Sequence, residues 1–184
     1  ILPTGSGKSL CYQLPTYLIE KPTLVISPLI SLMDDQVMQM KLNGESHVSY
    51  IHSGMDEIEK RNHINQISQS RFIYLSPEFL LQPQNFKLIS HLDFGLIVLD
   101  EAHCLSEWGY DFRPHYALIG QITSHFKNAR ILALTATAPP HLEEDLSHIL
   151  SIDLNVIKTS MKRDNISLQH KNFNDDEEKI KWLI

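Results

Sequence analysis

In the segment Leu96-Ile97-Val98-Leu99-Asp100-Glu101-Ala102-His103, four apolar residues are followed directly by two acids. A short β-branched and aliphatic run of this kind is typical of a buried strand. Asp100 and Glu101 then lie at the carboxyl end of that strand, which is the edge where open α/β sheets bind their ligands. The stretch therefore predicts an α/β domain with an acidic site at one edge of its sheet.

Short apolar runs alternate with longer amphipathic stretches along the rest of the chain. This alternation predicts βα units and a mainly parallel sheet flanked by helices on both faces. The expected strands are residues 24–26, 48–51, 72–75, 96–99, 131–134 and 155–157, and the expected helices are residues 8–19, 30–41, 56–69, 115–125 and 139–150. Pro15 is expected to kink or divide the first helix, and Pro139 and Pro140 to open the last one.

The composition is that of an ordinary globular domain. Of 184 residues, 42% are hydrophobic and 21% are charged, and the net charge of −6 argues against histone-like or polybasic nucleic-acid binding. No apolar run approaches the roughly 18–20 residues of a membrane span, and the first residues are not a secretory signal. Cys11 and Cys104 have no CxxC partners and the histidines show no metal-ligand spacing, which indicates reduced thiols and no zinc site.

A glycine-containing loop, Gly5-Ser6-Gly7-Lys8-Ser9, lies between an expected strand end and the first helix. Glycines let successive N–H groups face phosphate oxygens, and the start of the helix adds its positive dipole. In such a loop Lys8 would reach the β- and γ-phosphates, and Ser9 would hold Mg²⁺. Leu2 occupies the first Gly position of the strict GxxxxGK[ST] pattern, so a Gly-rich turn without a ligand is the alternative.

The two acids complement that loop. Asp100 suits Mg²⁺ coordination, directly or through water, and Glu101 suits orienting and deprotonating an attacking water. Alternatively the carboxylates cap the next helix, which would explain one acid but not its pairing with Lys8 and Ser9.

Together these motifs resemble those of superfamily-two helicases. Residues 3–9 are similar to their Walker A loop, with Thr4, Gly5, Ser6, Gly7, Lys8 and Ser9 as nucleotide-binding residues; residues 100–103 resemble a DEAH-type Walker B and residues 135–137 motif III. The resemblance sharpens towards RecQ-family DNA helicases through residues 10–15 (LCYQLP), 27–33 (SPLISLM), 74–78 (YLSPE) and 104–116 (CLSEWGYDFRPHY). It implies a RecA-like P-loop NTPase domain that uses ATP and Mg²⁺ and acts on single-stranded and forked DNA.

The segment 104–116 is similar to the aromatic-rich loop of RecQ helicases. Trp108 and Phe112, with Arg113 nearby, can stack on unpaired bases without reading sequence, because every base has a π-face. The alternative is that Trp108 and Phe112 fill the core. Tyr110 and His115 depart from the family, which usually has His and an acid there, so proton-linked coupling through Tyr110 is in doubt.

Several weaker motifs follow strand ends on the same edge. Ser27 and Ser76 could contact the phosphates of a bound nucleic-acid strand. The tripeptides that they begin, SPL and SPE, are ordinary turns when taken in isolation. Thr135 and Thr137 resemble residues that couple hydrolysis to domain movement. The alternative for Thr137 is a helix N-cap, and the two roles are compatible. His103 could link the acids to Thr135, or could be a neutral, hydrogen-bonded core histidine.

The resemblance also implies a domain organisation. Residues 1–157 are expected to form the first RecA-like domain, 158–172 a linker, and 173–184 the start of a second RecA-like domain that would supply an arginine finger. We expect the parent to be a 3′-to-5′ DNA helicase of repair and recombination, cytoplasmic in a bacterium or nuclear in a eukaryote. The chain alone is expected to be weakly active or inactive; the alternatives are a catalytically silent binding fragment and a DEAH-type RNA helicase domain.

Overall fold

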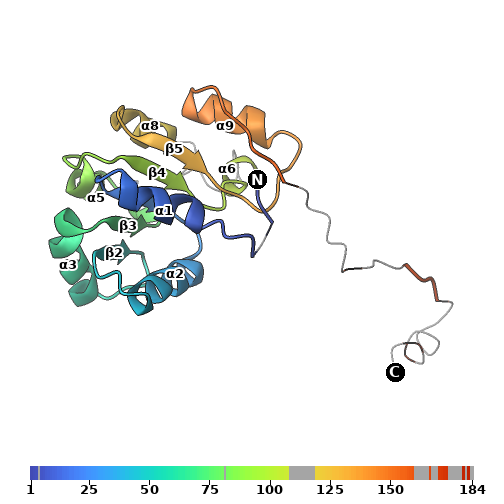
Figure 1. The fold of residues 1–184 in the computed structure, drawn as a ribbon, viewed down its shortest axis with the longest axis horizontal. Coiled ribbons are helices and arrows are strands. Elements are labelled where there is room, and N and C mark those ends of the chain that lie inside the picture. The colour runs from blue at the N-terminus through green and yellow to red at the C-terminus, as the bar shows by residue number, and fades with distance from the viewer. Residues whose placement is uncertain are drawn as a thin grey trace.

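A parallel sheet of five strands forms the centre of the part of the chain that the structure describes (Figure 1). The computed structural model describes residues 1–3, 5–80, 82–107 and 119–159, together with residues 166, 170–173, 180 and 182. The strands are β1 (Thr23–Ile26), β2 (Val48–Ile51), β3 (Phe72–Leu75), β4 (Leu96–Leu99) and β5 (Arg130–Ala133), in the order β2-β3-β1-β4-β5. The predicted α/β class with a parallel sheet is therefore confirmed.

Helices cover both faces of the sheet. Along β1, Leu24 and Ile26 pack into one core cluster while Val25 packs into the other, as the period of two in a strand requires. The Val25 face is covered by α1 (Leu10–Leu18) and α2 (Ile30–Leu42). The helices that contribute to the opposite cluster or lie beside it are α3 (Glu57–Gln66) with the 3₁₀ turn η1 (Ile67–Gln69), α4 (Pro77–Leu80), α5 (Pro83–Ile89), α6 (Cys104–Glu107), α8 (Ile119–His125) and α9 (Leu142–Leu150).

Some predicted elements differ from the structure. Residues 155–157 do not form the expected strand, because the segment makes backbone hydrogen bonds only near its end: the Ile1 amino group donates to Ile157 O at 2.6 Å, and Thr159 N donates to Ile1 O at 3.3 Å. The last helix begins at Leu142 rather than at residue 139, since Pro139 and Pro140 occupy the turn before it.

Two further differences concern helices that contain prolines. Pro15 does not divide the first helix, since α1 continues through it to Leu18. The short helices α4 and α5, each with a proline as its first residue, were absent from the prediction because residues 77–89 show no long apolar period.

The strand order defines where a ligand can bind. From β1 the chain passes through α2 to β2 on one side of the sheet, whereas from β4 it proceeds to β5 on the other side. Connections that diverge in this way leave a crevice beyond the carboxyl ends of the two adjacent strands. Ser27 follows β1 and Asp100 follows β4, so both lie at this switch point.

Candidate nucleotide-binding and hydrolysis site

The loop of residues 5–9 is folded tightly against the start of α1. Gly5 and Gly7 have φ angles of +78° and +83°, a backbone region that side-chain-bearing residues rarely adopt. Ser6 donates from its backbone N and its hydroxyl to Pro3 O, at 3.2 and 2.6 Å, and Leu10 N donates to Gly7 O at 2.9 Å. The loop thus passes directly into a helix N-terminus, as a phosphate site requires. Thr4 lies outside the described residues.

Residues 1–3, which precede the loop, form no strand but are attached to the sheet. Leu2 N donates to Thr135 O at 3.1 Å, just beyond the end of β5. This bond places the loop of residues 5–9 at the same sheet edge as the acids that follow β4. Lys8 is close enough to Asp100 for its charge to lower the pKa of that carboxyl.

Asp100 is a buried carboxylate with few partners. It is 6% exposed, accepts from the Glu101 backbone N at 3.1 Å, and accepts from the Ser27 hydroxyl at 3.4 Å. Burial and the charge of Glu101 raise the pKa of Asp100, and they outweigh the opposite effects of its hydrogen bonds and of Lys8. A buried acid beside a second acid is the arrangement that a bound cation would stabilise.

Glu101 occupies a strained backbone conformation. Its φ of +48° lies in the left-handed region, which costs a non-glycine residue about 1–2 kcal/mol. Ala102 N donates to Leu134 O at 2.9 Å, and Cys104 N donates to Glu101 O at 2.9 Å, so a bond to the residue after β5 and the start of α6 hold the turn. The turn directs the Glu101 carboxylate towards His103, with Oε2 3.2 Å from Nδ1.

His103 joins Glu101 to Thr135. Its Nδ1 is also 3.0 Å from Thr135 Oγ1, and Thr135 donates its hydroxyl proton to Thr137 O at 2.7 Å while accepting from Thr137 N at 3.2 Å. Because the Thr135 proton is already used, the hydrogen joining Nδ1 to these oxygens is carried by His103. The Cys104 thiol, 3.7 Å from Nε2, is placed to donate to the other ring nitrogen.

The structure gives Ser27 and Ser76 internal hydrogen bonds. Ser27 is 2% exposed and donates to Asp100, whereas Ser76 is 1% exposed and accepts from Phe79 N at 3.3 Å, so that it caps α4. The contacts of these two serines with nucleic-acid phosphates are not tested by the structure and stay a prediction. Any such contact would come from the loops that these residues begin rather than from their buried hydroxyls.

The predicted base-stacking residues Trp108, Phe112 and Arg113, and the departures Tyr110 and His115, lie outside the described residues. The segment that leads to them is described as far as residue 107, and its Cys104 and Leu105 side chains are buried in the core.

Two features of the site are not predicted by the sequence analysis. One is the direct bond from Ser27 to Asp100, which depends on the strand order. The other is a buried tyrosine pair, Tyr12 on α1 and Tyr74 on β3. The available signal was a tyrosine in each of two segments, 10–15 and 72–75, that otherwise read as core.

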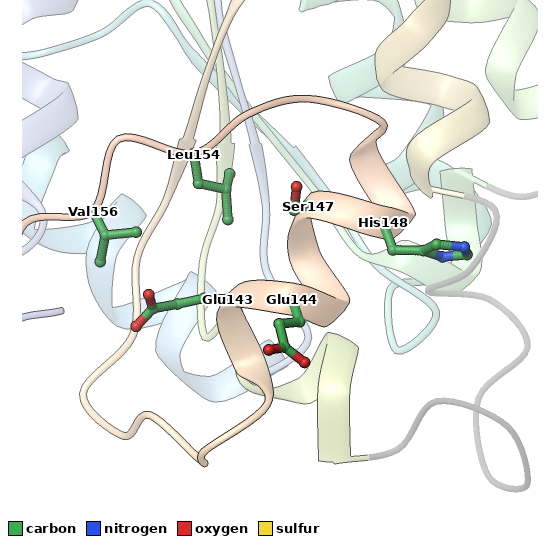
Figure 2. A pocket seen from close by; sticks show the side chains of 6 residues that line it. All are labelled: Glu143, Glu144, Ser147, His148, Leu154 and Val156. Atoms are coloured by element: carbon green, nitrogen blue, oxygen red, sulfur yellow. The ribbon is translucent and has the colours of Figure 1, made fainter.

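A separate hollow lies along α9. A pocket of about 520 Å³ lies between this helix and the segment that follows it. Figure 2 shows the side chains that line it: Glu143, Glu144, Ser147, His148, Leu154 and Val156. None of these residues belongs to the loops at the carboxyl ends of β1 and β4. Its two carboxylates would repel phosphates, so it is not the nucleotide site.

The comparisons with known proteins agree with this geometry. A family model described as DEAD/DEAH box helicase matches residues 1–145. The chain belongs to this family. The resemblance to RecQ helicases is also confirmed: the chain is 42% identical over 185 residues to the probable ATP-dependent DNA helicase RecS of Bacillus subtilis, and 44% identical over 154 residues to the ATP-dependent DNA helicase RecQ of Pasteurella multocida.

These alignments cover 100% and 83% of this chain but only 37% and 24% of the two relatives, so the chain spans well under half of their length. Among solved structures, a hypothetical ATP-dependent RNA helicase from Sulfolobus tokodaii matches 83% of this chain and 45% of its own, with a TM-score of 0.64 and 23% identity. The Hef helicase domain of Pyrococcus furiosus matches 84% of this chain and 33% of its own, with a TM-score of 0.63 and 22% identity. These structures support the fold alone. Among the described helices, none has the length and apolar character needed to cross a bilayer.

Proposed function

We propose that this chain is the ATP-binding and hydrolysing motor domain of a 3′-to-5′ DNA helicase of repair and recombination. In this role, ATP hydrolysis drives translocation along single-stranded DNA and unwinding of the duplex. The observation that carries the proposal is the convergence of three segments at one sheet edge: the phosphate-binding loop, the acids after β4, and the threonines after β5. The family membership and the DNA-helicase relatives support the same reading.

In this proposal the loop binds the triphosphate. Backbone N–H groups of Gly5, Gly7, Lys8 and Ser9 and the N-terminus of α1 would face the phosphates, and Lys8 would contact the β- and γ-phosphates as a point charge. Compensating charge is needed there, because the chain carries a net charge of −6.

Ser9 and Asp100 are the residues that would hold Mg²⁺. The donor set fits this ion, since a hydroxyl and a carboxylate are oxygen ligands and the raised pKa of Asp100 reports a buried negative charge that is not fully compensated. Bound Mg²⁺ would neutralise charge on the phosphate oxygens. The described residues hold no cluster of three or more His, Cys, Asp or Glu that could bind a metal by itself, so phosphate oxygens and water would complete the coordination.

Glu101 acts as the general base in this proposal, because it lies next to Asp100 and its carboxylate is oriented by His103. The bond from His103 to Thr135 then connects the base to the segment after β5, which would report hydrolysis to a second RecA-like domain. Trp108, Phe112 and Arg113 would stack on single-stranded DNA, and the loops led by Ser27 and Ser76 would contact its backbone. We assign residues 1–157 to the motor domain, 158–172 to a linker, and 173–184 to the start of the second domain.

The test is nucleotide binding and nucleic-acid-stimulated hydrolysis. Binding of a fluorescent ATP analogue with Mg²⁺ should be lost in Lys8→Ala and retained in the matched control Lys21→Ala, since Lys21 is exposed and pairs with Asp93 at 2.7 Å. In the full-length protein, single-stranded DNA should stimulate ATPase activity more than RNA does. Greater stimulation by RNA would favour an RNA helicase, whereas DNA binding that persists in Lys8→Ala without any ATPase activity in the wild type would favour a silent binding module.

A further inference from the structure

A short chain of hydrogen bonds is buried between α1, α2 and β3, on the Val25 face of the sheet. The hydroxyls of Tyr12 and Tyr74 are 2.9 Å apart, and Tyr12 also donates to Gln36 Oε1. Tyr12 is 1% exposed and Tyr74 is fully buried, with Met40 Sδ 3.2 Å from the Tyr74 hydroxyl. Gln36 is only partly buried, so the chain of bonds leads from the core towards the surface of α2.

The number of hydroxyl protons determines which group donates in each of these hydrogen bonds. Each phenol has one proton, and the Tyr12 proton is used in the bond to Gln36. The 2.9 Å bond between the phenols is therefore donated by Tyr74, since a thioether sulfur such as that of Met40 is a much weaker acceptor. Burial raises the pKa of Tyr12 to about 12, so the phenol stays protonated at neutral pH. The order of donation is Tyr74 to Tyr12 to Gln36.

These buried hydrogen-bonded side chains lower the stability of a core that apolar residues could fill instead. The buried residues around them are otherwise aliphatic, methionine and phenylalanine side chains, with the partly buried Tyr50 packed against them. Burying hydroxyls costs free energy unless all of them are paired, and a paired network fixes one relative placement of the elements that carry it. Phenylalanines of the same shape would fill the space without fixing that placement.

The three elements held together in this way each carry part of the proposed site. Tyr12 lies one helical turn after Ser9, at the start of α1. Gln36 lies on α2, which begins directly after the loop led by Ser27, and Tyr74 lies on β3, which runs into Ser76. Burial raises the pKa of Tyr12, and the charge of Asp100 raises it further.

We propose that Tyr12, Tyr74 and Gln36 are positioning residues that couple nucleotide binding at residues 5–9 to strand binding at the loops led by Ser27 and Ser76. A shift of α1 when the phosphates bind is passed through these bonds to α2 and β3, whose ends hold the two loops. The inference rests on the proposed function, because it requires both a nucleotide and a nucleic-acid strand as ligands.

The experiment measures the coupling between the two ligands in the full-length protein. The Kd of a fluorescent oligo-dT is determined with and without a non-hydrolysable ATP analogue and Mg²⁺, and the ratio of the two constants is the coupling factor. For the wild type we expect a factor of roughly 5–150 in either direction. In Tyr12→Phe, Tyr74→Phe and Gln36→Leu it should fall at least threefold towards 1, while the Kd of each ligand alone changes less than twofold.

Two control variants separate coupling from stability. Gln36→Glu retains an oxygen acceptor for Tyr12 and should keep the wild-type factor. Tyr50→Phe removes a phenol from the same sheet outside the network and should also keep it. If the three test variants lose thermal stability but keep the wild-type coupling factor, the residues are merely structural and the proposal is overturned. If the wild-type protein binds neither ligand, the proposed function fails and the inference fails with it.

Discussion

The hydroxyl of Thr135 is the point at which the segment after β5 is joined to the acidic site. It donates to Thr137 O at 2.7 Å, accepts from Thr137 N at 3.2 Å, and lies 3.0 Å from His103 Nδ1. Replacing Thr135 by valine removes all three hydrogen bonds and leaves the shape of the side chain nearly unchanged. Because no cavity is created, the loss of stability comes from hydrogen bonding alone.

The magnitude follows from what each partner keeps. Thr135 is 3% exposed, whereas Thr137 is exposed, so water can reach part of the Thr137 backbone after the substitution. His103 keeps its contact with Glu101 Oε2 at 3.2 Å. At about 1 kcal/mol for each net hydrogen bond and partial compensation at both partners, Thr135→Val should lower the unfolding free energy by about 2 kcal/mol. For a domain of this size that corresponds to roughly 4–8 °C in Tm.

The assay is urea unfolding of the chain followed by circular dichroism, with the m-value as the check that only stability has changed. Thr137→Val is the matched control, since it makes the same chemical change two residues away on an exposed side chain; it should stay within about 0.5 kcal/mol of the wild type. If the two variants are equally stable, the hydroxyl of Thr135 does not organise this segment and the reasoning is refuted.

Three further substitutions test separate parts of the structure. Asp100→Asn should abolish hydrolysis yet raise the unfolding free energy at pH 7 by roughly 0.5–2 kcal/mol. Burial and the charge of Glu101 raise the pKa of Asp100 in the folded state, and the ionisation of this carboxyl at pH 7 therefore opposes folding. The gain should shrink in urea titrations as the pH falls towards about 3.9, the pKa of an unfolded Asp; no gain at pH 7 would contradict the argument. Gly120→Ala should lower the unfolding free energy by about 1–3 kcal/mol in thermal unfolding, since the added Cβ would lie 2.0 Å from the Ile149 carbonyl oxygen where α8 meets α9. An unchanged Tm would show that the two helices can separate freely. Asp56→Ala should lower the unfolding free energy by about 1 kcal/mol and reduce hydrogen-exchange protection in α3, because Asp56 caps the first turn of this helix. The control Glu57→Ala should leave that protection nearly unchanged.

The sequence was sufficient for the sheet and for the elements that carry the acids. Runs such as residues 72–75 and 96–99 are fully buried strands with a clear apolar pattern, and the structure places them as predicted. Residues 155–157 show the limit of this reasoning. An apolar run becomes a strand only where a neighbour pairs with it along its length, and here Ile1 contacts only its end.

The site was predictable at the level of residue types but not in its detail. The topology rule brings Lys8 and Asp100 to one edge, because parallel strands present their carboxyl ends together. The positive φ of Glu101 and the bond from Ser27 to Asp100 depend on strand order and on a local turn, which no residue pattern encodes. The pairing of Tyr12 with Tyr74 likewise arises between segments far apart in the chain.

The hydrogen bonds between Ile1 and residues 157–159 have a mechanical consequence. Ile1 donates to Ile157 O and accepts from Thr159 N, which is the bonding pattern of neighbouring parallel strands. Tension applied to the chain beyond Thr159 would load these two bonds in shear, and the peptide that receives the load runs within a few residues into Gly5 and Lys8. The loop of residues 5–9 therefore lies next to the point where an external force would enter the domain. If this loop binds nucleotide as proposed, an optical-tweezers measurement should detect nucleotide binding as a change in the force that detaches this segment.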